Sequence, residues 1–272
     1  MSMQPVPFVE LLESDFASCC AQLYQEPAVR WLLDGRLHPG GEELTLRAAE
    51  LAGIGEGSRV LDVASGAGTT AALLAREPGA EVVGVELNES AVAEARAAAA
   101  DAGLDGAVSF AQGDAGALSL ADASVDAVLC ECSLCLFEDK LAAVREMARV
   151  LRPGGSVVVA DVTVNREILP APLLSGAARV ACVADALPLE GYELLLRDAG
   201  LRVGWVEQRC DAIAAMADRV EARLRAARIM RAPALEPVRS GLDDAVGLAR
   251  LAKRAIADGA LGYALLVAAR AR

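Results

Sequence analysis

The sequence is short of aromatic residues, histidine, positive charge and long apolar runs, and each shortage narrows the possible functions. Aromatic residues make up 3% of the 272 residues and the net charge is −12. A nucleic-acid partner needs a basic surface, so this charge argues against one. No uncharged apolar run approaches the length of about 18 residues that a membrane span requires. Much of the hydrophobic content is alanine, and alanine-rich helices favour a compact helical cover over a sheet.

The seven cysteines form no repeated CxxC…CxxC pattern. A disulfide framework or a structural zinc site is therefore not expected. Residues 1–9 contain two prolines and no basic residue, which does not fit a signal peptide. We expect a cytoplasmic protein whose cysteines stay reduced.

Apolar strands alternate with amphipathic helices along most of the chain. Strands are predicted at 59–63, 81–85, 107–111, 125–130, 156–162, 202–206 and 263–268. Helices of 10 to 16 residues between the first strands indicate right-handed βαβ units. The predicted fold class is α/β, with a doubly wound, mostly parallel seven-stranded sheet.

The two ends of the chain depart from this alternation. Helices predicted at 8–34 and 42–52 form an N-terminal helical cover, assigned to residues 1–53. The α/β domain is assigned to residues 54–272. Two further helices make a helical insert at about 211–257, before the last strand.

A loop of very small residues follows the first predicted strand. Residues 60–70 read VLDVASGAGTT, a strand that runs into an acidic residue, small residues and then a helix. Small residues let the backbone approach a ligand closely, and the helix N-terminus offers unpaired N–H groups. The loop alone also fits a dinucleotide fingerprint, so the residues after it decide which cofactor is bound.

Carboxylates follow the next two strands. Glu86 ends the second strand, 20 residues after Gly66, where a carboxylate accepts the hydroxyl hydrogens of a ribose. Asp114 follows the third strand and suits an adenine amino group. The motif LRPGG at 151–155 precedes the fifth strand.

In this order, these four signals resemble the class I S-adenosylmethionine-dependent methyltransferases over residues 42–163. The resemblance implies a Rossmann-like methyltransferase fold with S-adenosylmethionine as cofactor. It places the following residues at the cofactor: Asp62, Ala64, Gly66, Gly68, Thr69, Glu86, Leu87, Asp114, Ala115 and Glu131. The family usually has glycine at position 64, and the methyl group of Ala64 is expected to require a negative φ there.

Two cysteines indicate the substrate. Cys132 lies just past the fourth strand, in VLCECSLCLFEDK at 128–140, and Cys182 lies 50 residues on, in ACVADAL at 181–187. This pair looks like that of the arsenite methyltransferases, which implies that Cys132 and Cys182 are catalytic residues holding trivalent arsenic. The resemblance extends to Cys20 as a third thiol. His38, the only histidine, stands in a loop that can fold over the site and is assigned to substrate binding.

The chain differs from those enzymes in one segment. They usually carry a further cysteine in Tyr-Gly-Cys-Gly, whereas residues 36–41 read RLHPGG. A third thiol must then come from Cys20 or from a small molecule. Cys130, Cys135 and Cys210 are interpreted as packing residues.

The predicted function is methyl transfer to a small soft acceptor, with trivalent arsenic the best guess because soft centres prefer thiolate ligands. One alternative is a small-molecule C- or O-methyltransferase of the quinone-biosynthesis type, with an apolar pocket formed by helices 8–34 and 211–257. Another is a non-catalytic binder of the cofactor or a metalloid. Each reading expects a small-molecule partner, no nucleic acid and no membrane.

Overall fold

The computed structural model describes residues 27–34, 38–174, 182–229 and 241–272. The predicted helical stretch 8–26 and the cysteine Cys20 lie outside these ranges. No described helix is long and apolar enough to cross a membrane.

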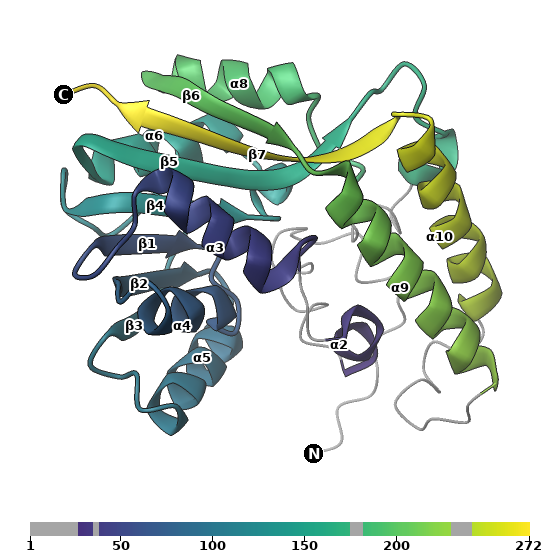
Figure 1. Cartoon of the computed structure of the whole chain (residues 1–272), viewed down its shortest axis with the longest axis horizontal. Helices are drawn as coiled ribbons and strands as arrows, with labels where there is room; N and C mark the ends of the chain where they lie inside the picture. Colours follow the sequence, from purple (N-terminus) through teal and green to yellow (C-terminus); the bar gives the residue numbers. More distant parts are fainter. Residues whose placement is uncertain (1–26, 35–37, 175–181, 230–240) are drawn as a thin grey trace.

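A seven-stranded sheet forms the centre of the molecule (Figure 1). Its strands are β1 (Arg59–Val63), β2 (Glu81–Glu86), β3 (Val108–Gln112), β4 (Val125–Glu131), β5 (Leu151–Val164), β6 (Leu201–Gln208) and β7 (Leu261–Arg270). The strand order is β3-β2-β1-β4-β5-β7-β6, and β7 is antiparallel to both of its neighbours. The predicted α/β fold class is confirmed. The order reverses between β1 and β4, and ligands of such sheets bind beside that point, at the carboxyl ends of the strands.

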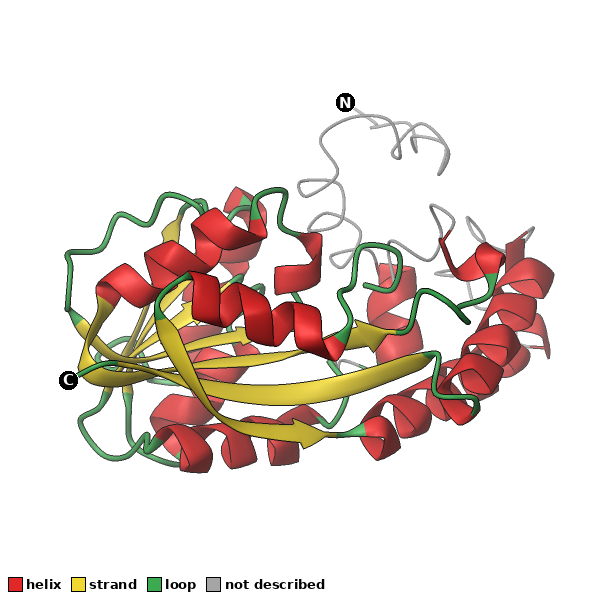
Figure 2. Ribbon diagram, turned by 90° about the horizontal axis from the view of Figure 1, so that it is seen from above, coloured by secondary structure: helices red, strands yellow, loops and turns green. Residues whose placement is uncertain are grey.

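Helices cover both faces of the sheet (Figure 2). The helices are α2 (Pro27–Leu33), α3 (Gly41–Ala52), α4 (Thr69–Arg76), α5 (Glu89–Asp101), α6 (Lys140–Val150), α8 (Leu189–Asp198), α9 (Cys210–Ile229) and α10 (Leu242–Ala257), with short 3₁₀ turns η2 (Leu134–Leu136) and η3 (Ala171–Leu174). One apolar cluster joins the sheet to α3, α4 and α5, and a second joins its other face to α6 and α8. Side chains of β4 alternate between the two clusters, as the period of a strand requires: Ala127 and Leu129 enter the first, Val128 and Cys130 the second.

The helices α9 and α10 pack side by side, near the start of β7 (Figure 1). A third apolar cluster, which includes Leu224 of α9 and Val246 of α10, joins them to Ala28 of α2. The arginine-rich part of α9 is held by charge pairing. The buried carboxylate of Glu221 accepts hydrogen bonds from Arg225, Arg250 and Lys253.

The fifth strand is longer than predicted. It begins at Leu151 and continues through the Pro-Gly-Gly segment, where its pairing with β4 shifts register between Val125 and Ala127. Gly155 explains the continuation, because a Cβ there would lie 2.7 Å from the carbonyl oxygen of Asp126. Only glycine lets the two backbones approach this closely.

Candidate functional site

A cavity of about 700 Å³ opens at the carboxyl ends of the central strands. Most of the residues predicted to bind cofactor or substrate line it, namely His38, Asp62, Ala64, Gly66, Thr69, Glu86, Leu87, Asp114, Ala115, Glu131 and Cys132. Residues of the segment after β4 and of α6 complete the wall, among them Ser133, Leu136, Phe137 and Ala142. No arginine or lysine is among the described residues of this lining.

The small-residue loop after β1 is held in a left-handed backbone conformation. Ala64 has φ +59° and Gly66 has φ +53°. The expectation of a negative φ at Ala64 is therefore wrong. The loop is fixed from both sides, since Ser65 N donates to Val85 O at 3.1 Å and Gly68 N donates to Ser65 O at 2.9 Å. These bonds force the alanine into a region that only glycine adopts freely.

We expect Ala64→Gly to raise the free energy of unfolding by about 0.5–1 kcal/mol. A left-handed conformation costs an L-residue roughly 1–2 kcal/mol, and the extra chain entropy of glycine cancels part of that gain. Urea unfolding of the two proteins measures the difference. A less stable variant would contradict the strain inferred at this position.

Gly68 lies outside the cavity lining. It precedes α4 with φ +80°, and a Cβ at this position would lie 2.5 Å from the Phe110 ring. The close packing of this part of the loop against β3 therefore requires glycine.

Glu86, at the end of β2, connects the small-residue loop to the start of α5. Its Oε2 accepts from Gly66 N at 3.0 Å and its Oε1 accepts from Asn88 N at 2.9 Å. The side chain is 6% exposed and borders the cavity. A carboxylate fixed in this way has lone pairs left to accept two neighbouring hydroxyl groups of a ligand.

Asp62 carries a buried oxygen without a partner. The residue is 3% exposed, and its Oδ2 makes no hydrogen bond in the described structure. Burial and the nearby charges of Glu131 and Glu86 raise the pKa of the Asp62 carboxyl well above its ordinary value. With several carboxylates and no lysine or arginine at the cavity, this end suits a positively charged ligand group.

Glu131, at the end of β4, accepts hydrogen bonds from two threonine side chains and lies near His38. Thr45 Oγ1 lies 3.0 Å from its Oε1, and Thr70 Oγ1 lies 2.9 Å from its Oε2. His38 Nε2 lies 3.8 Å from Oε2 and 3.5 Å from Thr45 Oγ1. Glu131 therefore ties α3 and the histidine loop to the cavity. Thr45 and Thr70 were not predicted, because lone threonines on helices carry no sequence signal.

The cysteines Cys132 and Cys182 come together beside the cavity. Cys182 Sγ donates to Cys132 O at 3.4 Å. Both residues have left-handed backbones, with φ +52° and +61°. Cys132 lines the cavity, whereas Cys182 is 1% exposed and lies behind it. The neighbouring Cys182, followed by burial, raises the pKa of the Cys132 thiol, so this thiol stays protonated until a ligand displaces its proton.

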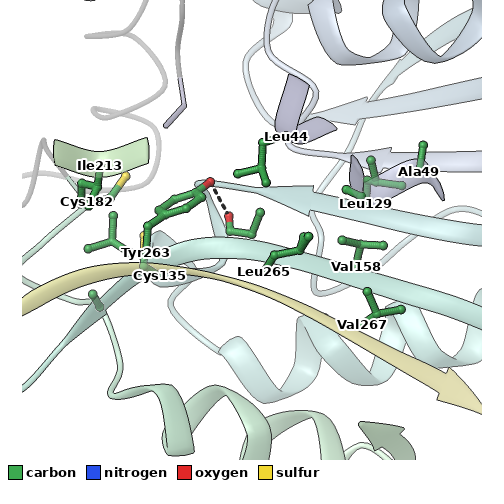
Figure 3. Packing of buried hydrophobic residues seen from close by; sticks show 14 of the residues in the cluster. Leu44, Ala49, Leu129, Cys135, Val158, Cys182, Ile213, Tyr263, Leu265 and Val267 are labelled. Atoms are coloured by element: carbon green, nitrogen blue, oxygen red, sulfur yellow. Dashed lines mark hydrogen bonds between the residues drawn. The ribbon is translucent and has the colours of Figure 1, made fainter. Parts of the chain in front are cut away.

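Two further groups adjoin this pair. Cys135 is fully buried, and burial, followed by the nearby Cys182, raises the pKa of its thiol. Asp161, on β5, is also fully buried and accepts from Cys135 N at 2.9 Å. Figure 3 shows Cys135 and Cys182 near Tyr263, in the apolar cluster that contains both. Sequence reasoning had assigned Cys135 to packing and did not single out Asp161.

The remaining described cysteines lie elsewhere. Cys130 points to the opposite face of the sheet, where its thiol lies 3.2 Å from Ser133 Oγ, and Cys210 is exposed. All five described cysteines are free thiols. Among the described residues, no group of three His, Cys, Asp or Glu side chains is arranged to hold a metal ion.

Residues 54–194 match a family model described as a methyltransferase domain. The methyltransferase GfsG of Streptomyces halstedii is 34% identical over 61% of this chain and 60% of GfsG, so the match spans less than two thirds of that relative. The ubiquinone/menaquinone biosynthesis C-methyltransferase UbiE of Pseudomonas paraeruginosa is 33% identical over 69% of this chain and 72% of UbiE. An arsenite methyltransferase of Halobacterium salinarum is 32% identical over 55% of this chain and 38% of that protein.

Solved structures share the fold over almost the whole chain. The [4+2]-cyclase SpnF has a TM-score of 0.78 and 22% identity, covering 98% of this chain and 99% of SpnF. The phosphoethanolamine N-methyltransferase 2 of Haemonchus contortus, in complex with S-adenosyl-L-methionine, has a TM-score of 0.76 and 20% identity. The match covers 93% of this chain and 60% of that protein.

Proposed function

The chain belongs to the methyltransferase domain family and is an S-adenosylmethionine-dependent methyltransferase, and from this premise we propose that its methyl acceptor is trivalent arsenic held by cysteine thiols. The observation that carries the proposal is the contact between Cys132 and Cys182 at the wall of the cavity. Two thiols side by side favour a soft acceptor.

The backbone at these two cysteines supports a functional role. Each takes a left-handed φ that disfavours any residue except glycine, and such strain collects at functional sites. At Cys132 the conformation is fixed by its backbone N–H, which donates to Ala160 O at 2.7 Å. This hydrogen bond fixes the position of the Cys132 backbone, from which the side chain reaches the cavity lining.

The chemistry needs position more than a base. When bound, S-adenosylmethionine would supply a methyl group on a positively charged sulfur. The arsenic lone pair would form the As–C bond as the S–CH3 bond breaks, and the bonding electrons would stay on the sulfur of S-adenosylhomocysteine, which leaves. Each cysteine binds arsenite by exchange: an As–OH bond breaks, an As–S bond forms, and the thiol proton leaves with the hydroxide as water. Cys132 and Cys182 then hold the acceptor in line with the methyl group, which supplies much of the rate enhancement.

The cavity fits the cofactor at three points. The unpartnered oxygen of Asp62 suits the positively charged methionine end, and the fixed carboxylate of Glu86 suits the ribose hydroxyls. Asp114 and Ala115, also in the lining, suit the adenine. Glu131 would fix the loop of His38 across the same opening.

Product analysis tests the function directly. The purified protein is incubated with S-adenosylmethionine, arsenite and a small thiol, and arsenic species are separated and quantified. We expect methylated arsenic, and none when S-adenosylmethionine is omitted. Tight binding of S-adenosylmethionine without any arsenic product would overturn arsenic as the acceptor and leave the enzyme class intact.

We expect Glu86→Ala to weaken S-adenosylmethionine binding by about 1–3 kcal/mol, as for a lost charge-assisted hydrogen bond. Calorimetric titration measures the affinity, and Glu89→Ala, an exposed carboxylate three residues on, is the matched control. Unchanged affinity in Glu86→Ala would remove Glu86 from the ribose site.

A second candidate is C-methylation of a quinol-like substrate. Its support is the UbiE relative, which matches more of this chain than the arsenite methyltransferase does, and the apolar side chains of Leu136 and Phe137 in the cavity wall. This function predicts methylation of a demethylated quinol that survives replacement of both Cys132 and Cys182. Loss of that activity in the double variant would count against it.

A further inference from the structure

We propose that His38 is the general base of a further activity, the O-methylation of a neutral phenol. Methyl transfer to arsenic uses a lone pair that is already free and needs no base, so this inference goes beyond the arsenic acceptor. His38 is the only histidine of the chain and lines the cavity, with 14% of its side chain exposed. Its neighbours determine which ring nitrogen can take up a proton.

The contacts of the imidazole ring leave Nε2 as its basic atom. Nδ1 lies 3.2 Å from Pro39 O, and because a carbonyl oxygen only accepts, Nδ1 carries the proton of the neutral ring. Nε2 lies 3.5 Å from Thr45 Oγ1, whose own hydrogen is donated to Glu131. Among the described contacts, Nε2 therefore meets no donor and keeps its lone pair.

Glu131 is placed to stabilise the imidazolium ion that forms when Nε2 takes up a proton. Its Oε2 lies 3.8 Å from His38 Nε2, and only 5% of its side chain is exposed. Thr45 on α3 and Thr70 on α4 donate to this carboxylate at 3.0 and 2.9 Å, so two helices hold it in place. A fixed carboxylate beside an imidazole is the arrangement that supports histidine bases in hydrolases.

The pair lies at the reacting end of the cavity. Glu131 ends β4 and is followed directly by Cys132, and β4 pairs with β1, which carries Asp62 at the end assigned to the methionine part of the cofactor. Asp114, assigned to the adenine, follows β3, two strands from β1 on the other side. His38 is therefore near the transferred methyl group rather than near the adenine.

The cavity wall indicates the class of acceptor. No lysine or arginine is among its described residues, so a negatively charged acceptor would meet several carboxylates and a single histidine. The side chains of Leu136 and Phe137 offer apolar contact to a ring. A neutral phenol meets both conditions.

The step conserves atoms and charge. The phenol O–H bond breaks and its proton passes to His38 Nε2. The oxygen forms a bond to the methyl carbon as the S–CH3 bond breaks, and the electrons of that bond stay on the sulfur. The imidazolium releases its proton to water after the methyl ether leaves.

Hydroquinone, a neutral ring with two hydroxyl groups, is the probe, and the rate of methyl ether formation is measured. We expect the wild type to form the ether and His38→Asn to be slower by roughly 100-fold or more, the lower end of what a positioned base contributes. Asparagine keeps a donor for Pro39 O but has no basic nitrogen. Added imidazole should restore part of the lost rate, which a purely structural role of the ring would not allow.

The control is Glu42→Gln, an exposed carboxylate in the first turn of α3, which should keep full activity. Calorimetry checks that His38→Asn still binds S-adenosylmethionine; if it does not, His38→Gln is measured in its place, with the same imidazole rescue. A wild-type rate in the histidine variant, or a loss that imidazole does not restore, would overturn the base. So would a wild type that leaves hydroquinone unmethylated, a result that leaves the arsenic product test unaffected.

Discussion

Replacing Cys182 by serine is expected to lower the rate of arsenite methylation by roughly 100-fold or more, the size of effect seen when a reacting group is misplaced by about 1 Å. Serine keeps the size of the side chain, but its oxygen is a poor ligand for a soft centre. Cys182 is the partner of Cys132 in the proposed pair, so its replacement leaves Cys132 as the single thiol of that pair. The measurement is the yield of methylated arsenic per unit time.

The same preparation must still bind its cofactor. Cys182 lies behind the cavity wall rather than in it, so calorimetry should give the wild-type affinity for S-adenosylmethionine. Cys210→Ser, which changes an exposed thiol at the start of α9, is the matched control and should keep full activity. Wild-type methylation by Cys182→Ser would show that the thiol pair serves packing alone.

The sheet was predictable because its signal is local. Each strand is a short apolar run, and the first helices begin or end at residues that the sequence marks. Asn88 is an example: it caps the N-terminus of α5, and its side chain accepts hydrogen bonds from the backbone N–H groups of Ser90 and Ala91. The predicted first strand, 59–63, agrees with β1 residue for residue. The start of β5 was missed because Pro153 reads as a chain break, whereas the close approach of Gly155 to its neighbour is a tertiary contact.

The cavity was predictable for a related reason. Parallel strands end at one edge, so the residues after β1, β2, β3 and β4 had to meet there. Side-chain contacts between distant segments have no such rule. The contact of Cys135 with Asp161 and that of Cys182 with Cys132 each depend on the packing of separate segments, and no spacing in the sequence encodes them. The left-handed φ of Ala64 depends likewise on bonds to β2.

The buried carboxyl of Asp161 should make the protein less stable as the pH rises from 5 to 8. Burial, followed by the nearby Cys182, raises the pKa of Asp161 from 3.8 to about 7. The folded state therefore keeps a proton that the unfolded chain releases near pH 4, so stability falls until the pH passes 7. At about 1.4 kcal/mol per pKa unit, the loss between pH 5 and 8 is roughly 3 kcal/mol.

Asp161→Asn should remove this slope, because the amide does not titrate, even if the variant is less stable at every pH. Asp62, whose pKa is also raised, contributes a slope of the same sign in both proteins, so the difference between them is the informative quantity. Urea unfolding at pH 5 and pH 8 measures it. Asp126→Asn is the control: the pKa of Asp126 is lowered, so its own contribution is complete well below pH 5. Parallel pH profiles for the wild type and Asp161→Asn would mean that Asp161 is ionised throughout this range, with the thiols beside it facing a permanent negative charge.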